Sequence, residues 1–301
     1  MFRTSRRRAI LALAVAAALT ATTAACGSET SDNNTGSAPA ASASADTSLA
    51  DKVPADIKTA GKLVIGTDST YAPSEFLDAD GKTVIGFDVD LFNAVAQKLG
   101  LTTEWQSATF DSIIPGVTSK KYAAGVSSFT INKTRLQQVT MVSYFNAGTQ
   151  WAAKTGATIS PDDACGKKIA VQTATVQVDD LTARSKKCTD GGKAKITIDQ
   201  YQAQSDATNA VVTGKDDAML ADSPVCAYAV KQTNGQLALL GDIYDSAPYG
   251  YVLPKDQADT MAVAVQGALK ALIADGTYKT ILAKWGVDAG AITDPTVNPT
   301  V

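Results

Sequence analysis

Histidine is absent from the 301 residues of this chain. Its absence excludes a Ser-His-Asp triad, a Cys-His pair, an imidazole base and any metal site built on histidine ligands. Basic residues are also scarce, with 27 Lys and Arg against 30 Asp and Glu, a formal net charge of −3. Because nucleic-acid binding needs a basic face, we do not expect a nucleic acid among its partners.

Apolar runs long enough to cross a membrane are missing after the first 25 residues. The hydrophobic content of 45% and the charged content of 19% are ordinary for a globular protein and exclude global disorder. At roughly 100–200 residues per domain, the length predicts one large domain or two modest ones.

Residues 1–25 have the three parts of a secretory signal peptide. Four arginines precede an apolar run from Ile10 to Leu19, and small residues lead to Cys26. The apolar run is too short to span a bilayer. Thr23-Ala24-Ala25-Cys26 resembles a bacterial lipobox, which implies that Cys26 receives a lipid and begins the mature chain. Ordinary cleavage near Ala25 with release is the alternative, and Ser5-Arg6-Arg7 leaves a twin-arginine export route open.

Residues 26–52 are rich in Ser, Ala, Thr, Gly and Asn and contain almost no large apolar side chain. Such a segment cannot bury an apolar face, so we predict a disordered tether. Together with the anchor, it predicts a folded domain at the extracytoplasmic face of the bacterial cell membrane, held there by lipid alone.

Short apolar strands alternate with helical patterns along the remaining chain. The strand at 63–66 precedes a helix at 88–99, for which Asp88 is the expected N-cap, and the strand at 168–171 precedes a helix at 176–187. This alternation predicts an α/β layer structure in two blocks of about 100 residues. Two such lobes that face each other would form a cleft, where a ligand can bind.

Three cysteines remain once Cys26 is assigned to the lipid. Cys165 and Cys188 lie 23 residues apart in a chain that we expect to be exported, so we predict a disulfide between them. A zinc site is not expected, since neither histidine nor a CxxC motif accompanies them. Cys226 lies in an apolar stretch and is predicted to be a buried free thiol.

Six segments between Lys62 and Trp285 follow one another in the order of a known family. They are Gly66–Pro73, Gly86–Leu91, Phe110–Pro115, Thr130–Arg135, Ala218–Asp222 and Asp275–Tyr278. Together they resemble the polar amino-acid family of extracellular solute-binding proteins, which serve ABC importers. No single segment is specific, and the resemblance depends on their number and order.

The resemblance implies a periplasmic binding protein type 2 fold. Its two lobes are mixed sheets flanked by helices, joined by two crossover strands that we expect near Thr149–Ala153 and Ser246–Tyr251. Lobe 1 is then expected at 53–150 plus 249–286, lobe 2 at 151–248 and a tail at 287–301. The function implied is capture of a polar or basic L-amino acid by hinge closure, for an ABC permease and its ATPase. We expect a monomer, no cofactor, no metal and no catalytic residue.

The family's contacts with the amino-acid backbone fall on polar residues here. Arg135 occupies the carboxylate position, where a guanidinium fork binds in a bidentate way. Asp222 occupies the ammonium position, although an N-cap of the helix that follows is an equally good interpretation of its sequence context. The remaining positions that match are Ser128, Thr130, Thr175 and Val176, the last two at a helix start that favours anions.

Four further positions are expected to contact the ligand side chain, and one of them carries a different residue type from that of relatives. Tyr71 and Phe110 match aromatic residues that sandwich the ligand, with core packing as the alternative. Asp68 matches a position that binds an amide or cationic side chain of the ligand. Gln172 faces the same region and replaces the Lys or apolar residue of relatives, so the sequence does not name the amino acid.

Two other functions use the same fold. A cyclohexadienyl-dehydratase-like enzyme would need a spare acid–base pair, and none is evident beside Arg135 and Asp222. A ligand-sensing domain would need a membrane-spanning helix after Trp285, and the residues that follow are polar. Gly81-Lys82-Thr83 resembles the end of a P-loop, but Phe76 stands where a glycine is required.

Overall fold

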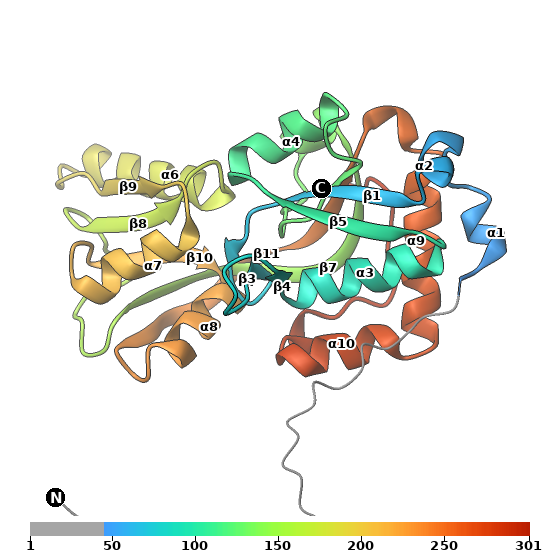
Figure 1. Cartoon of the computed structure of the whole chain (residues 1–301). Coiled ribbons are helices and arrows are strands. Elements are labelled where there is room, and N and C mark those ends of the chain that lie inside the picture. Colours follow the sequence, from blue (N-terminus) through green and yellow to red (C-terminus); the bar gives the residue numbers. More distant parts are fainter. Residues whose placement is uncertain (1–44) are drawn as a thin grey trace, which may run out of the picture. The chain divides into compact units, whose positions relative to one another are not determined.

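Residues 45–301 are described by the structure, a computed structural model (Figure 1). The chain divides after Ala38, and these residues belong to the unit that begins at Pro39. The predicted signal peptide, Cys26 and most of the predicted tether lie outside the described residues. Among the helices of residues 45–301, none combines the length and apolar character needed to cross a lipid bilayer.

Strands and helices alternate along this part of the chain. The strands are β1 (Lys62–Thr67), β2 (Thr70–Tyr71), β3 (Glu75–Leu77), β4 (Val84–Ile85), β5 (Thr102–Ser107), β6 (Ala124–Gly125), β7 (Thr140–Lys154), β8 (Lys168–Gln172), β9 (Thr197–Tyr201), β10 (Ala218–Asp222) and β11 (Leu237–Leu253). The α-helices are α1 (Thr47–Ala50), α2 (Ala55–Ala60), α3 (Phe87–Lys98), α4 (Phe110–Thr118), α5 (Lys133–Gln138), α6 (Val176–Asp190), α7 (Gln204–Thr213), α8 (Ser223–Gln232), α9 (Met261–Ala274) and α10 (Thr277–Trp285). Short 3-10 helices are η1 (Lys255–Gln257) and η2 (Asp288–Gly290).

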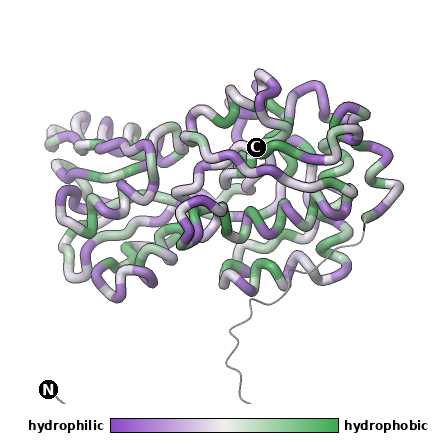
Figure 2. Tube along the Cα trace, viewed as in Figure 1, coloured by the Kyte–Doolittle hydropathy of each residue, from purple (hydrophilic) through white to green (hydrophobic). Residues whose placement is uncertain are grey.

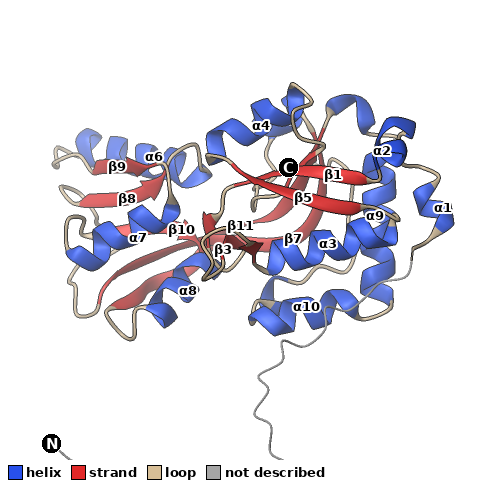
Figure 3. Cartoon of the chain, viewed as in Figure 1, coloured by secondary structure: helices blue, strands red, loops and turns tan. Residues whose placement is uncertain are grey.

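One sheet runs through the unit in the strand order β5-β1-β6-β11-β7-β10-β8-β9. Its middle strands, β7 and β11, pair antiparallel from Leu237 opposite Lys154 to Leu253 opposite Thr140. Parallel strands β5, β1 and β6 lie on one side of them, and parallel strands β10, β8 and β9 lie on the other. Figures 1 and 3 show the helices gathered around these two groups of strands. The predicted α/β fold of two lobes joined by two crossover strands is confirmed.

Each lobe has its own apolar core. In the first lobe, α3 and α9 bury Leu91, Val95 and Leu269 completely. In the second, strands β8 and β10 are almost wholly buried between helices. Each fully buried Leu or Val stabilises the fold by about 1.5–3 kcal/mol. Figure 2 shows hydrophilic and hydrophobic residues alternating along the helices, the pattern of elements that bury one face.

A small three-stranded sheet, β2-β3-β4, lies beside the first lobe. It leads into α3 through Gly86, whose φ of 142° is one that residues with a side chain rarely adopt. A Cβ atom at this position would also collide with the backbone carbonyl of Ser74. Gly86 therefore lets the β-hairpin pack against the start of α3, which brings Glu75 close to Asp88.

The segments that precede and follow the predicted lobes have more structure than the sequence predicts. The tether predicted at 26–52 is wrong at its end, because 47–50 form α1, Asp46 caps that helix and Leu49 packs against the first core. The predicted tail, 287–301, lies against the first lobe, where Asn298 Oδ1 accepts the N–H of Met141 at 2.8 Å. Few apolar residues are enough in each case, since both segments add to an existing core.

The cysteine prediction is confirmed, whereas that for Asp88 is wrong. Cys165 and Cys188 form a disulfide, with their Cα atoms 5.6 Å apart, and Cys226 is a buried free thiol. The N-cap position of α3 belongs to Gly86, and Asp88 lies inside the helix, fully buried. Its side chain accepts hydrogen bonds from Ser128 and Tyr144 instead.

Candidate functional site

Nine of the ten ligand-binding residues expected from the sequence line one small space between the lobes. They are Tyr71, Phe110, Ser128, Thr130, Arg135, Gln172, Thr175, Val176 and Asp222. The tenth, Asp68, lies behind this space and accepts a hydrogen bond from Gln172. The first lobe and the second both contribute, as expected for a cleft ligand site.

Arg135 is placed by the short helix α5. Asn132 caps that helix, and its Oδ1 accepts the N–H of Arg135 at 2.9 Å. The guanidinium then donates from Nη1 to Thr130 O at 2.8 Å and from Nη2 to Ala174 O at 3.3 Å. Because Ala174 belongs to the opposite lobe, the Arg135 side chain bridges the cleft.

Two aromatic rings flank the guanidinium. Its Cζ lies 5.3 Å from the ring centroids of both Phe110 and Phe129, which stack on each other 4.6 Å apart. Burial lowers the pKa of Arg135 to about 10, so the side chain stays charged at neutral pH. A buried cation that donates only to carbonyl groups attracts an anion strongly.

Asp222 ends β10 and occupies the N-cap position of α8, yet its side chain does not cap that helix. Its Oδ2 accepts from the Tyr71 hydroxyl at 2.7 Å, and its Oδ1 accepts from Gln177 Nε2 at 2.8 Å. Burial raises the pKa of the Asp222 carboxyl, and the bonds from Tyr71 and Gln177 oppose that rise. Of the two sequence interpretations, the geometry favours the one in which the carboxylate faces the cleft.

Asp68 follows β1 and collects hydrogen bonds on both carboxylate oxygens. Oδ1 accepts from the N–H and the hydroxyl of Thr70, and Oδ2 accepts from Phe110 N at 3.1 Å and Gln172 Nε2 at 2.8 Å. Burial raises the pKa of the Asp68 carboxyl, while these bonds lower it. The Gln172 amide therefore takes the place that a ligand donor could occupy.

The start of α6 faces the same space. Thr175 is the N-cap residue of α6, but its hydroxyl donates back to Gln172 O at 2.8 Å and does not cap the helix. Ala174, just before it, has a φ of 60°, in the left-handed region. Thr175, Val176 and Gln177 line the space, so the positive end of the α6 dipole lies at the cleft.

The cleft is closed. The space between the nine residues measures about 10 Å³, room for at most one water molecule. A further bond between the lobes runs from Gln204 N to Thr70 Oγ1, at 3.1 Å. A wider space of about 310 Å³ adjoins it, lined by residues of α4, α5 and the start of α6. An amino acid can therefore bind between Arg135 and Asp222 only when the lobes move apart.

Two residues of the site were not predicted from the sequence. Gln177 is buried and joins Asp222 to the hydroxyl of Thr149, and Ser127 accepts from the N–H of Asp68 and donates to Glu75. The sequence offered one indication of each: Gln177 follows Val176, and Ser127 precedes Ser128, and both neighbours were expected at the site. Neither residue type indicates its partner, because those partners are brought by other elements.

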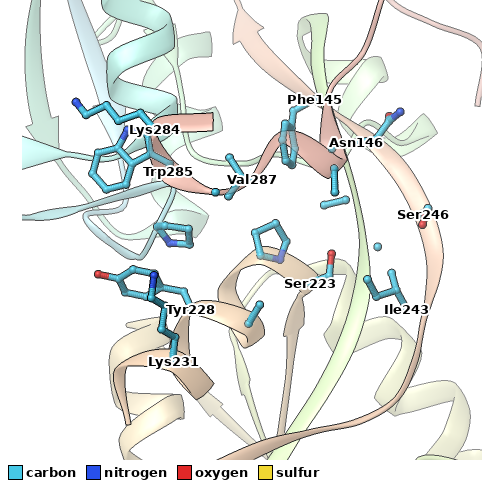
Figure 4. A pocket seen from close by; sticks show the side chains of 18 residues that line it. Phe145, Asn146, Ser223, Tyr228, Lys231, Ile243, Ser246, Lys284, Trp285 and Val287 are labelled. Atoms are coloured by element: carbon cyan, nitrogen blue, oxygen red, sulfur yellow. The ribbon is translucent and has the colours of Figure 1, made fainter. Parts of the chain in front are cut away.

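A larger cavity of about 550 Å³ lies elsewhere and shares no residue with the cleft. Figure 4 shows Tyr228 and Lys231 of α8 facing Lys284 and Trp285 of α10 across it, with Phe145 of β7 at one end. In Figure 1, α8 and α10 lie on one side of the crossover strands, and α4 and α6 lie on the other. We call this cavity the rear pocket. The cleft, not the rear pocket, holds the buried charges that suit a charged ligand.

Known proteins agree with this geometry. The profile of the bacterial extracellular solute-binding proteins, family 3, matches residues 63–288. The chain belongs to this family. The arginine-binding protein ArgT of Corynebacterium glutamicum is 36% identical over 249 residues, which are 82% of this chain and 81% of that protein. The lysine/arginine/ornithine-binding periplasmic protein of Escherichia coli is 31% identical over 233 residues, 73% of this chain and 86% of that protein.

Solved structures of the family have the same fold. An ancestral arginine-binding protein bound to arginine superimposes with a TM-score of 0.69 and 32% identity, covering 75% of this chain and 98% of its own. These relatives are all described as binding proteins. Membership of the family therefore establishes an amino-acid solute-binding protein with two lobes.

Proposed function

We propose that this protein captures a basic L-amino acid, arginine foremost, in the cleft between its lobes. One observation carries the proposal: Arg135 and Asp222 are buried around the same space, and a second carboxylate, Asp68, is buried directly behind it. Their sum is one negative charge. A ligand with a carboxylate, an ammonium and a cationic side chain has the complementary charges, and relatives named for arginine support the choice.

The α-amino acid group engages residues from both lobes in this proposal. Arg135 presents two parallel N–H donors to the carboxylate, and the N–H groups at the start of α6 assist. Asp222 accepts from the ammonium, while Ser128 and Thr130 complete the hydrogen bonds. Each end of the zwitterion thereby exchanges its water for a fixed opposite charge. Without such a partner, the burial of a charged group is very unfavourable.

The ligand side chain extends toward Asp68 in this proposal. Tyr71 and Phe110 enclose its aliphatic stem, and its cationic end displaces the Gln172 amide from Asp68 Oδ2. The charge gained at Asp68 is the feature that separates arginine or lysine from a neutral amino acid.

Capture and release follow from rotation of the lobes about β7 and β11. We assign 53–150 with 249–286 to one lobe and 151–248 to the other. Because groups from both lobes must contact the ligand together, binding shifts the population to the closed form. Small-angle scattering should give a smaller radius of gyration with arginine, and an unchanged radius at saturation contradicts hinge closure.

The setting of this function is the outer face of the bacterial cell membrane. In this proposal Cys26 carries the lipid, the protein is a monomer, and its partners are an ABC permease and its ATPase. Replacing Cys26 with Ala should release the protein into the medium. A wild-type protein that is already fully soluble and begins at another residue contradicts the anchor.

A thermal-shift screen of the twenty amino acids tests the function. A ligand at 100 times its dissociation constant stabilises the native state by about 2.7 kcal/mol, which gives a measurable rise in melting temperature. Arginine should give the largest rise, followed by lysine, with aspartate and glutamate inert. The proposal fails if no amino acid shifts the melting temperature, or if only acidic ones do.

A further inference from the structure

Two carboxyl groups lie buried behind the cleft. Glu75 of β3 and Asp88 of α3 have no exposed surface, and they lie close enough together that each shifts the pKa of the other. The other groups that bond to them within the described residues are hydroxyls and one backbone N–H, with no lysine or arginine. Two uncompensated negative charges at this depth would be very costly.

The distribution of donors identifies which carboxyl group holds a proton. Asp88 Oδ2 accepts three bonds: from Ser128 N and Ser128 Oγ, both at 3.2 Å, and from the Tyr144 hydroxyl at 2.6 Å. Glu75 Oε1 accepts one, from Ser127 Oγ at 3.0 Å. The remaining oxygens, Glu75 Oε2 and Asp88 Oδ1, are buried and have no hydrogen-bond partner among the described groups, which leaves both free to share a proton.

A bond between two carboxyl groups requires a proton on one of them. Asp88, which accepts three donors, is suited to be the carboxylate, and Glu75 is left as the acid that donates. The electrostatics agree, since burial raises the pKa of Asp88 to about 6. Burial first, and then the charge of Asp88, raise the pKa of Glu75 well above its usual value.

The pair holds two consecutive residues of the cleft wall. Ser128 has a φ of 48°, in the left-handed region, a strained conformation for a residue other than glycine. Its N–H and its hydroxyl both bond to Asp88, and this offsets the strain. Ser127 bonds to Glu75 and also accepts the N–H of Asp68, at 3.0 Å. Both serines line the space between the lobes.

We infer that Glu75 and Asp88 share one proton, and that the protonated pair positions the Ser127–Ser128 turn to receive the ligand. Neither residue touches the ligand in this account, so both are positioning residues. The inference concerns the same cleft as the proposed function, and it rests on that proposal for the identity of the ligand. The shared proton itself is a property of the protein without ligand.

Four other titratable groups lie around the pair. They are Asp68 on the cleft side, Tyr144 of β7, Tyr251 of β11 and Tyr278 of α10. Burial raises the pKa of all three tyrosines, so they stay neutral over the physiological range. The charge of Asp68 adds to the rise in the pKa of Glu75.

The raised pKa of Glu75 fixes the direction of the pH effect. The folded protein keeps a proton on Glu75 that the unfolded chain releases near its ordinary pKa. Stability contributed by this group is therefore fully present at low pH and falls as pH rises toward the raised pKa. Glu75→Gln removes this slope, since an amide donates N–H to Asp88 without titrating.

Infrared spectroscopy of the full chain tests the shared proton without any ligand. At pH 7 the wild-type protein should show the carbonyl stretch of a protonated, buried carboxylic acid, and Glu75→Gln should lack that band. A wild-type spectrum without an acid band, or a band that persists in Glu75→Gln, overturns the inference. If the wild-type protein binds no amino acid, the proposed function fails while this measurement still decides the shared proton.

Two variants at the same position test the positioning role. Glu75→Gln should bind arginine within about threefold of the wild type, and between pH 5 and pH 8 its stability should fall less steeply with rising pH than that of the wild type. Glu75→Leu fills similar space but donates nothing to Asp88, so its affinity should fall about tenfold or more. Equal affinity of Glu75→Leu and the wild type contradicts the role. Should Glu75→Leu fail to fold, the shallower slope of Glu75→Gln relative to the wild type still decides whether Glu75 holds the proton, and an equal slope contradicts the inference.

Discussion

The Tyr71 hydroxyl binds Asp222 at two atoms across the cleft. It donates to Oδ2 at 2.7 Å and lies 3.3 Å from the backbone N–H of Asp222, which donates to it. The two residues belong to different lobes and are 151 positions apart. The carboxylate that we propose for the ligand ammonium is therefore also one that holds the lobes together.

Tyr71→Phe should weaken arginine binding about tenfold or more. The variant removes a bond to a charged, buried group, worth about 1.5–3 kcal/mol, from the closed form only. Titration calorimetry gives the affinity, and scattering should show a larger radius for the ligand-free variant. Tyr228→Phe is the matched control, since Tyr228 lines the rear pocket and not the cleft. Unchanged affinity in Tyr71→Phe contradicts the role of this bond.

Arginine affinity should fall as the pH is lowered from 7 to 5. Burial raises the pKa of Asp222, so acid protonates this carboxyl in the free protein, whereas the ammonium needs it ionised. Binding must then release a proton, which calorimetry in two buffers of different ionisation enthalpy detects. Asp222→Asn should bind more weakly and with a flatter pH profile. A wild-type affinity that rises on acidification would disprove this assignment.

The rear pocket offers a way to strengthen binding from outside the cleft. It is lined by α8 of one lobe and α10 of the other, on the far side of the crossover strands (Figures 1 and 4). Rotation that opens the cleft must bring these helices together. A bulky side chain there should oppose opening and so favour the closed form.

Ala227→Trp places such a side chain in the rear pocket and should tighten arginine binding about fivefold or more. Ala283→Trp is the control, because Ala283 is exposed on α10 and does not line the pocket. Affinities from calorimetry compare the two variants. Weaker arginine binding by Ala227→Trp than by Ala283→Trp would contradict this coupling between the rear pocket and the cleft.

The sequence predicted the fold and most of the cleft because these depend on local patterns. Strands that end in polar residues, such as Ala218–Asp222, place those residues at the cleft whatever surrounds them. The order of six short segments then identified the family. Nine of the ten expected ligand positions consequently lie around one space.

What the sequence left open depends on contacts between distant elements. Asp88 has the position and residue type of an N-cap, and only the packing of Glu75 from β3 makes it a buried partner of Ser128. Asp222 also suits an N-cap, and its direction is decided by Tyr71 and Gln177. Leu49 looked like part of a tether, since a lone leucine gives no sign of the core that it joins.

Recognition of the α-amino acid group by Arg135 is the central claim. Truncating one partner of a buried charge pair costs about 2–5 kcal/mol, because the other charge is left without a partner. Arg135→Ala should therefore lose at least ~30-fold in arginine affinity, at ~1.4 kcal/mol per decade. Arg184→Ala is the control, since Arg184 pairs with Asp180 on α6 and does not line the cleft.

The most direct measurement compares arginine with agmatine, which has the same side chain and amine but no carboxylate. Titration calorimetry gives both affinities for the wild type and for Arg135→Ala, with circular dichroism as the check of folding. The wild type should prefer arginine by at least ~30-fold, and Arg135→Ala should lose most of that preference. A folded Arg135→Ala that binds arginine as tightly as the wild type, with the preference intact, contradicts the account.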